Sequence, residues 1–95
     1  DPEDQKAKAD QTKAYLEKKR EELAGEYRAL KQEKQRIGRQ EQKNGYKDSS
    51  LTANEQISQW NEKMKEFAKK RKVFNEIVQT FNETTGKNVQ SLPVP

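Results

Sequence analysis

Apolar residues in this chain recur at spacings of three and four, the pattern that one buried face of an α-helix produces. In the second half of the chain they form the a/d seam of a coiled coil, interrupted by one arginine. The positions of that seam are Ile57, Trp60, Met64, Phe67, Arg71, Phe74, Val78 and Phe81. In the first half, one large aliphatic residue recurs every seven positions, at Leu16, Leu23, Leu30 and Ile37. This pattern predicts two long helices that pack together along their length.

The first helix is expected to cover about residues 2–44. Asp1 can cap the exposed backbone amides, and Pro2 suits the first helical position. No proline or turn cluster follows before Asn44, and Gly45 can then take the left-handed conformation that ends many helices.

The second helix is expected over about residues 52–85, after a loop over about 45–51. Thr52 and Glu55 have the spacing of a capping box, in which each side chain satisfies the other residue's backbone amide. Gly86 offers a second C-cap. Long helices joined by a short loop pack as antiparallel neighbours. The sequence therefore predicts an all-α fold, an antiparallel coiled-coil hairpin.

The C-terminal residues differ from the rest of the chain. Residues 87–95 lack helical periodicity, and Pro93 and Pro95 stand at alternate positions, which favours an extended backbone. We expect an extended tail or a linker there, following a helical hairpin over residues 1–86.

Two registers of the hairpin are open, because facing residues in an antiparallel pair have a constant index sum. A sum of 97 pairs Leu30 with Phe67 and sets Glu26 opposite Arg71 as an ion pair in the seam. A sum of 94 pairs Tyr27 with Phe67 and sets a leucine against Arg71. We favour 97, because an arginine that faces leucine away from solvent is costly.

The two helices contribute unequally to the predicted seam. The second seam line of the first helix is polar, whereas the second helix adds Val73 and Ile77 beside its seam. Apolar residues near the end of the second helix are therefore expected to stay partly uncovered. These are Phe74, Ile77, Val78 and Phe81. Such a cluster predicts self-association or a partner helix, and hence a larger bundle. The alternative is cover within one chain by Ala14, Tyr15 and the stems of Lys18 and Lys19.

Composition narrows the class of protein. Only 28% of the 95 residues are hydrophobic, too few to fill a wide core. The longest apolar run, Ala14-Tyr15-Leu16, is far shorter than the ~20 residues that a membrane span needs. The chain has no cysteine and no histidine, so it lacks thiol chemistry and the commonest metal ligand and general base.

No other residue pattern predicts chemistry. The acidic residues lie among lysines on expected helix surface, and no base is present to activate Ser49 or Ser50. Asn82-Glu83-Thr84 matches a glycosylation sequon, but it falls inside the second helix. Heptad spacing makes core filling, not ligand stacking, the better interpretation of the aromatic row. We therefore expect no enzyme and no catalytic, cofactor-binding or metal-binding residue.

A basic segment raises the possibility of nucleic-acid binding, because such segments bind phosphate backbones. Its members are Lys63, Lys65, Lys69, Lys70, Arg71 and Lys72. On the heptad they spread around the helix, and no aromatic residue lies on the outer face to stack bases. A solvated surface is the favoured interpretation.

The first hypothesis for function is therefore a non-catalytic helical hairpin that mediates protein–protein association or oligomerisation. The basic, cysteine-free hairpin also resembles the coiled-coil arms of periplasmic chaperones of the Skp/OmpH type, which would imply a clamp for client proteins. The β-strand body that trimerises those chaperones is not apparent. A start without methionine and the absence of cysteine fit an exported protein, periplasmic or secreted, as well as a piece of a longer one.

Overall fold

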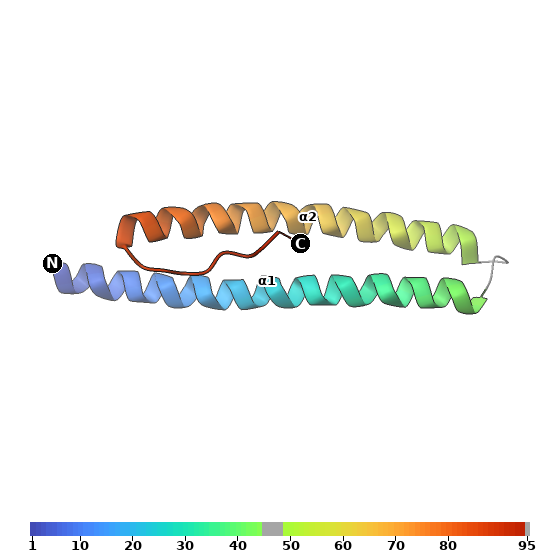
Figure 1. The fold of residues 1–95 in the computed structure, drawn as a ribbon, viewed down its shortest axis with the longest axis horizontal. Coiled ribbons are helices and arrows are strands. Elements are labelled where there is room, and N and C mark those ends of the chain that lie inside the picture. Colours follow the sequence, from blue (N-terminus) through green and yellow to red (C-terminus); the bar gives the residue numbers. More distant parts are fainter. Residues whose placement is uncertain (45–48, 95) are drawn as a thin grey trace. The chain divides into compact units, whose positions relative to one another are not determined.

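A computed structural model of the chain contains two helices, α1 (Pro2–Asn44) and α2 (Ser49–Thr85) (Figure 1). The structure describes residues 1–44 and 49–94, and the side chains of 1–39 and 54–94 among them. No strand occurs in these residues. The chain divides into two compact units, which we call unit 1 (Asp1–Ala24 with Lys70–Pro95) and unit 2 (Gly25–Lys69). In each unit, α1 packs antiparallel to α2, so the predicted all-α helical hairpin is confirmed.

The N-terminus of α1 has the cap that its sequence favours. The Glu3 amide donates to the Asp1 Oδ1 at 3.1 Å, and the Gln5 amide donates to the Asp1 carbonyl at 3.1 Å. Glu3 and Asp4 in the first turn add negative charge at the positive end of the helix dipole. The predicted C-cap at Gly45 lies outside the described residues.

The N-terminus of α2 differs from the prediction. The helix begins at Ser49, three residues before the predicted start near Thr52, and the side chain of Thr52 lies outside the described residues. Residues 49–51 contain no proline or glycine, so extending an existing helix through them adds one backbone hydrogen bond per residue.

The C-terminus of α2 closes on a glycine cap. Gly86 has a φ of 71°, in the left-handed region, and its amide donates to the Asn82 carbonyl at 2.8 Å. The Thr84 and Thr85 hydroxyls donate to carbonyls one turn earlier, each at 2.7 Å. These bonds fix the last turn of the helix, and the chain reverses direction after Gly86.

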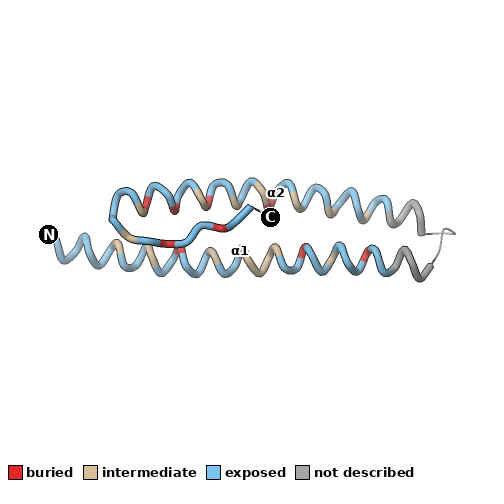
Figure 2. Tube along the Cα trace, viewed as in Figure 1, coloured by how far each residue is buried: buried red, intermediate tan, exposed pale blue. Residues whose placement is uncertain are grey.

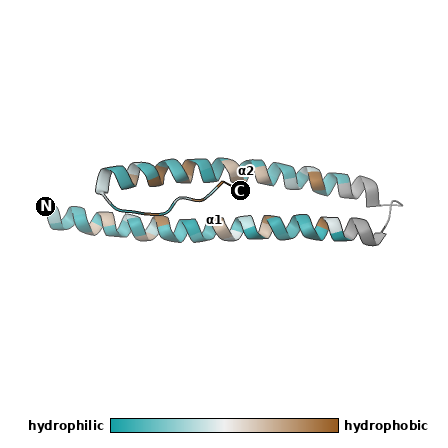
Figure 3. Cartoon of the chain, in the orientation of Figure 1, coloured by the Kyte–Doolittle hydropathy of each residue, from teal (hydrophilic) through white to brown (hydrophobic). Residues whose placement is uncertain are grey.

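Each unit has its own buried core, and Figure 2 marks its residues in red. Few hydrophobic positions stand among the hydrophilic ones along both helices (Figure 3). The core of unit 1 consists of Leu16, Leu23, Phe74, Val78, Phe81, Val89 and Leu92. The core of unit 2 consists of Leu30, Ile37 and Phe67.

In unit 2, aromatic side chains join the helices. The Tyr27 ring stacks on the Phe67 ring with centroids 5.4 Å apart. The indole Nε1 of Trp60 donates to the Leu30 carbonyl at 2.7 Å, and the Lys34 ammonium lies 5.0 Å from the centre of the indole ring. The cation–π contact and the hydrogen bond together hold a large, half-buried ring against a seam that has few aliphatic residues.

The contacts in unit 2 do not support a strict preference for one register. Tyr27 and Phe67 have an index sum of 94, whereas Glu33 and Lys63, whose carboxylate and ammonium are 3.0 Å apart, have a sum of 96. In a coiled coil each side chain packs among several residues of the facing helix, so one index sum is too strict a description.

The segment after Gly86 is packed against the helices of unit 1. Val89 is 3% exposed and Leu92 is 7% exposed, while Val94 is 75% exposed. Figure 1 shows the segment running back between α1 and α2. We call residues 87–94 the C-terminal strap. It was predicted as an extended tail or linker, and its packing on unit 1 was not foreseen.

The strap changes the expected exposure of the apolar cluster on α2. Phe74, Val78 and Phe81 are 4%, 2% and 7% exposed, so the expectation that they stay partly uncovered is wrong; only Ile77, at 49%, meets it. Cover comes from within the chain, but Tyr15 is 62% exposed. The strap supplies two aliphatic side chains that the seam of α1 lacks.

An ion pair ties the start of the strap to α1. The Lys87 ammonium donates to the Asp10 carboxylate at 2.8 Å, and this contact holds the pKa of Asp10 below its ordinary value of 3.8. Lys6 and Lys13 act in the same direction more weakly, and desolvation opposes them. A carboxylate with a lowered pKa in the folded state stabilises it above the ordinary pKa, and that contribution is lost as the pH falls through the folded value.

Acid is therefore expected to loosen the strap through Asp10. As the pH falls below 3.8 and through the lowered pKa of Asp10, the Val89 amide resonance of the wild type should move towards its unstructured position. The Asp10→Asn variant should lack the part of this shift that comes from the ion pair, and NMR titration of both chains measures it. Asp4→Asn, another exposed acid on α1, is the control and should titrate like the wild type. Identical titrations of the wild type and Asp10→Asn would contradict the expectation.

Candidate interaction surface

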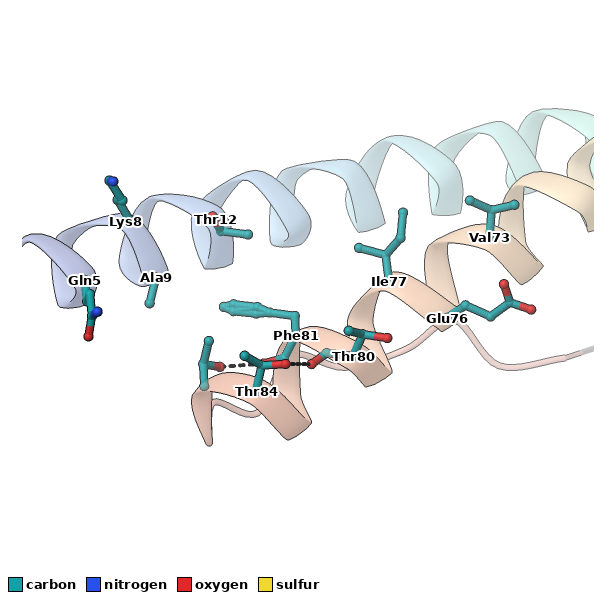
Figure 4. A pocket seen from close by; sticks show the side chains of 11 residues that line it. Gln5, Lys8, Ala9, Thr12, Val73, Glu76, Ile77, Thr80, Phe81 and Thr84 are labelled. Atoms are coloured by element: carbon teal, nitrogen blue, oxygen red, sulfur yellow. Dashed lines mark hydrogen bonds between the residues drawn. The ribbon is translucent and has the colours of Figure 1, made fainter.

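An open groove of about 650 Å³ lies between α1 and α2 in unit 1 (Figure 4). Phe81 forms part of it and points towards Ala9 of α1, whereas Val73 and Ile77 stand on the α2 side. Val73 is 56% exposed and Ile77 is 49% exposed. The lining residues are Gln5, Lys8, Ala9, Thr12, Val73, Glu76, Ile77, Thr80, Phe81, Thr84 and Thr85.

The α2 side of this groove follows from the heptad pattern. Val73, Ile77, Thr80 and Thr84 recur at spacings of four, three and four, and each one directly precedes a residue that faces α1 or the helix end. Because neighbouring residues are about 100° apart around a helix, this second row lies beside the seam at the edge of the helix pair. The row has the spacing of a coiled-coil face and lies exposed beside the first one.

The groove is poor in charge compared with the chain as a whole. Charged residues make up 38% of the sequence, but only Lys8 and Glu76 among the 11 lining residues carry a charge. Threonine, alanine and β-branched aliphatic residues replace the lysines and glutamates found elsewhere. Depletion of charged side chains distinguishes the centre of a protein interface from ordinary surface.

The residues that the sequence assigned to the seam fall into three groups in the structure. The buried ones are Leu16, Leu23, Leu30, Ile37, Phe67, Phe74, Val78 and Phe81. The half-buried ones are Glu26, Tyr27, Trp60, Met64 and Arg71. Ile57 and Ile77 are 38% and 49% exposed. Glu26 belongs to unit 2 and Arg71 to unit 1, and the ion pair between them stays a prediction.

The hydrophobic pattern of the sequence did not identify several residues of the groove and of the core. Ala9, Thr12, Thr80 and Thr84 line the groove, but small and hydroxyl-bearing residues give no hydrophobic signal. Val89 and Leu92 were missed as core residues. Their spacing of three places two side chains on one side of an extended chain, a signal too short to separate from chance.

The basic segment of α2 is neutralised in part by neighbouring glutamates. The ammonium groups of Lys65 and Lys69 lie 3.4 and 3.3 Å from the carboxylates of Glu62 and Glu66. Lys63 contacts Glu33 of α1 at 3.0 Å. Such exposed pairs contribute little stability, but they reduce the positive potential that a phosphate backbone would meet.

Neither an acidic cluster for a metal ion nor a membrane-spanning helix is found among the described residues. Three or more acidic side chains do not gather anywhere in residues 1–39 and 54–94 in a way that could hold a metal ion. No helix in the described part of the chain is both long enough and apolar enough to cross a bilayer.

Comparisons with protein-family models, with curated proteins and with solved structures find no match to this chain. A function for the chain is therefore proposed from its fold and its surfaces.

Proposed function

We propose that this chain is a non-catalytic interaction module that pairs with a second copy of itself through the groove of unit 1. The observation that carries the proposal is the exposure of Val73 and Ile77, two β-branched aliphatic residues one helical turn apart, in a groove poor in charge. Exposed apolar residues gathered on one face mark interaction sites in soluble proteins.

A second copy of the chain suits this surface because one face carries both the groove and a row of α2 side chains that could enter the groove of another copy. The row of Val73, Ile77, Thr80 and Thr84 on α2 has heptad spacing, which is the spacing by which one helix enters the groove of another. Two-fold pairing brings the same patch of both copies together, so each row of one copy packs in the groove of the other. Lys8 and Glu76 provide unlike charges for pairing across such an interface.

Replacing Ile77 by glutamate tests the pairing. Light scattering of the wild-type chain should give a mass that rises from monomer to dimer with concentration. Ile77→Glu should stay monomeric at the same concentrations, because a charge buried at the centre of the interface lacks a partner. Ile77 is half exposed in the monomer, so the variant should keep its helical circular dichroism.

The control is Val94→Glu, which replaces another exposed aliphatic residue, outside the groove, and should dimerise like the wild type. A wild-type chain that remains monomeric at all concentrations would refute pairing with a second copy. A client-holding clamp would differ again, because it would capture unfolded chains without forming a dimer of defined mass.

A further inference from the structure

Two asparagines of α2 hold the backbone of the strap. The Asn82 side chain donates through Nδ2 to the Val89 carbonyl at 3.0 Å and accepts from the Val89 amide through Oδ1 at 2.9 Å. Asn75 makes the same pair of bonds with Leu92, at 2.9 and 2.8 Å. Each asparagine side chain thus forms hydrogen bonds with both the N–H and the C=O of one strap residue, as a residue in a neighbouring β-strand would. We call each such pair of hydrogen bonds a bracket.

The spacing of these two brackets fits an extended chain. Asn75 and Asn82 are seven residues apart, which is about 10.5 Å along a helix. Val89 and Leu92 are three residues apart, which is about 9–10 Å along an extended chain. The two distances therefore match closely. A helix with asparagine at every seventh residue can thus hold an extended chain at every third residue.

The brackets make few demands on the sequence that they hold. They contact only main-chain atoms, so any residue with an amide hydrogen satisfies them. The side chains that the site can distinguish are the buried ones, Val89 and Leu92. Gln90 and Ser91 between them are exposed. In peptide recognition of this kind, main-chain hydrogen bonds provide affinity and side-chain pockets provide specificity.

Two contacts with α1 and open space beside the strap complete the site. Lys87 pairs with Asp10, and the Arg20 Nε donates to the Ser91 carbonyl at 3.4 Å, so α1 holds the strap from the other side. A space of about 370 Å³ remains beside it, lined in part by Asn75, Asn82 and Val89.

We propose that the face of unit 1 bearing Asn75 and Asn82 is a binding site for extended peptide segments with aliphatic residues at positions i and i+3, and that the strap occupies it as a built-in ligand. The site is separate from the groove at Val73 and Ile77. A covalently attached ligand competes at an effective concentration that is roughly millimolar for a short connection. A partner segment must therefore displace the strap or find it released.

The test uses the full-length chain with Val89→Asp and Leu92→Asp, which releases the strap and vacates the site. The probe is a fluorescein-labelled peptide with the sequence of residues 86–95, and its anisotropy reports binding. The released chain should bind the peptide at least about tenfold more tightly than the wild type, whose site is occupied. Equal or undetectable binding to both chains, with helicity retained, would overturn the proposal.

The bracket itself is tested by Asn82→Leu in the released chain, which keeps the side-chain size and removes both hydrogen bonds. Peptide affinity should fall by about tenfold or more. Asn61→Leu is the matched control, since Asn61 is an exposed asparagine two heptads before Asn75 on the same helix, and it should change affinity less than twofold. Equal losses from the two substitutions would refute the role of the bracket.

A second measurement covers the case in which releasing the strap unfolds the chain. In the ¹⁵N-labelled wild type, the Val89 and Leu92 amides should exchange slowly with solvent. Excess unlabelled peptide should accelerate their exchange by displacing the strap. A peptide in which Val89 and Leu92 are replaced by aspartate should leave the rates unchanged. Unchanged rates with the wild-type peptide would overturn the proposal without any substitution in the chain.

Discussion

Replacing Phe74 by alanine is expected to lower the free energy of unfolding by about 3–5 kcal/mol. Phe74 is 4% exposed in the core of unit 1, so truncation removes its contacts and leaves a cavity that two thin helices and a strap cannot readily fill. A loss of this size is a large part of the stability of a small domain. The variant should lose its helical circular dichroism well below the melting temperature of the wild type.

The matched control for Phe74 is its neighbour. Val73→Ala removes apolar atoms one position earlier on the same helix, but Val73 is 56% exposed, so at concentrations at which the chain is monomeric its cost should stay within about 0.5 kcal/mol. Chemical unfolding followed by circular dichroism measures both variants. Similar losses for Phe74→Ala and Val73→Ala would show that Phe74 does not occupy a core in solution.

Replacing Val89 by aspartate is expected to release the strap and lower the free energy of unfolding by about 2–3 kcal/mol. Burial of an aliphatic side chain contributes about 1.5–3 kcal/mol, and a carboxylate cannot take the place of Val89 at 3% exposure. Release also removes the cover that Leu92 provides, while the strap regains conformational entropy, which offsets part of the loss.

The control for the strap lies five residues further on. Val94→Asp makes the same chemical change at a side chain that is 75% exposed, so the midpoint of denaturant unfolding should match that of the wild type. The Val89→Asp midpoint should fall clearly below both. If Val89→Asp unfolds like Val94→Asp, the strap does not contribute to the stability of unit 1.

These predictions have different origins. The place of Phe74 in the seam follows from the heptad pattern, because Phe74 continues a row of residues at spacings of three and four that only a helix brings onto one face. Its full burial, which sets the size of the loss, was not expected from the sequence. The loss at Val89 could not be predicted in this way. Its burial depends on a chain reversal after Gly86 and on contacts with helix positions that are distant in the sequence.

Asn75 and Asn82 show why the second kind of feature stays hidden in a sequence. Both follow or flank seam residues and look like ordinary polar positions at the edge of a coiled coil. Asn82 even begins a glycosylation sequon, although its amide nitrogen is engaged with the Val89 carbonyl. A pair of asparagines seven residues apart can be recognised as a binding feature only when an extended chain with a matching repeat lies beside it.

Local chemistry along the chain was enough to predict the helices, the seam and the caps at Asp1 and Gly86, since periodicity and backbone preference act over a few residues. The packing of the strap and the exposure of the apolar cluster depended on tertiary structure. The physical reason is that burial is shared between segments. Whether Phe81 is covered or Ile77 is exposed depends on which other part of the chain occupies the space beside it.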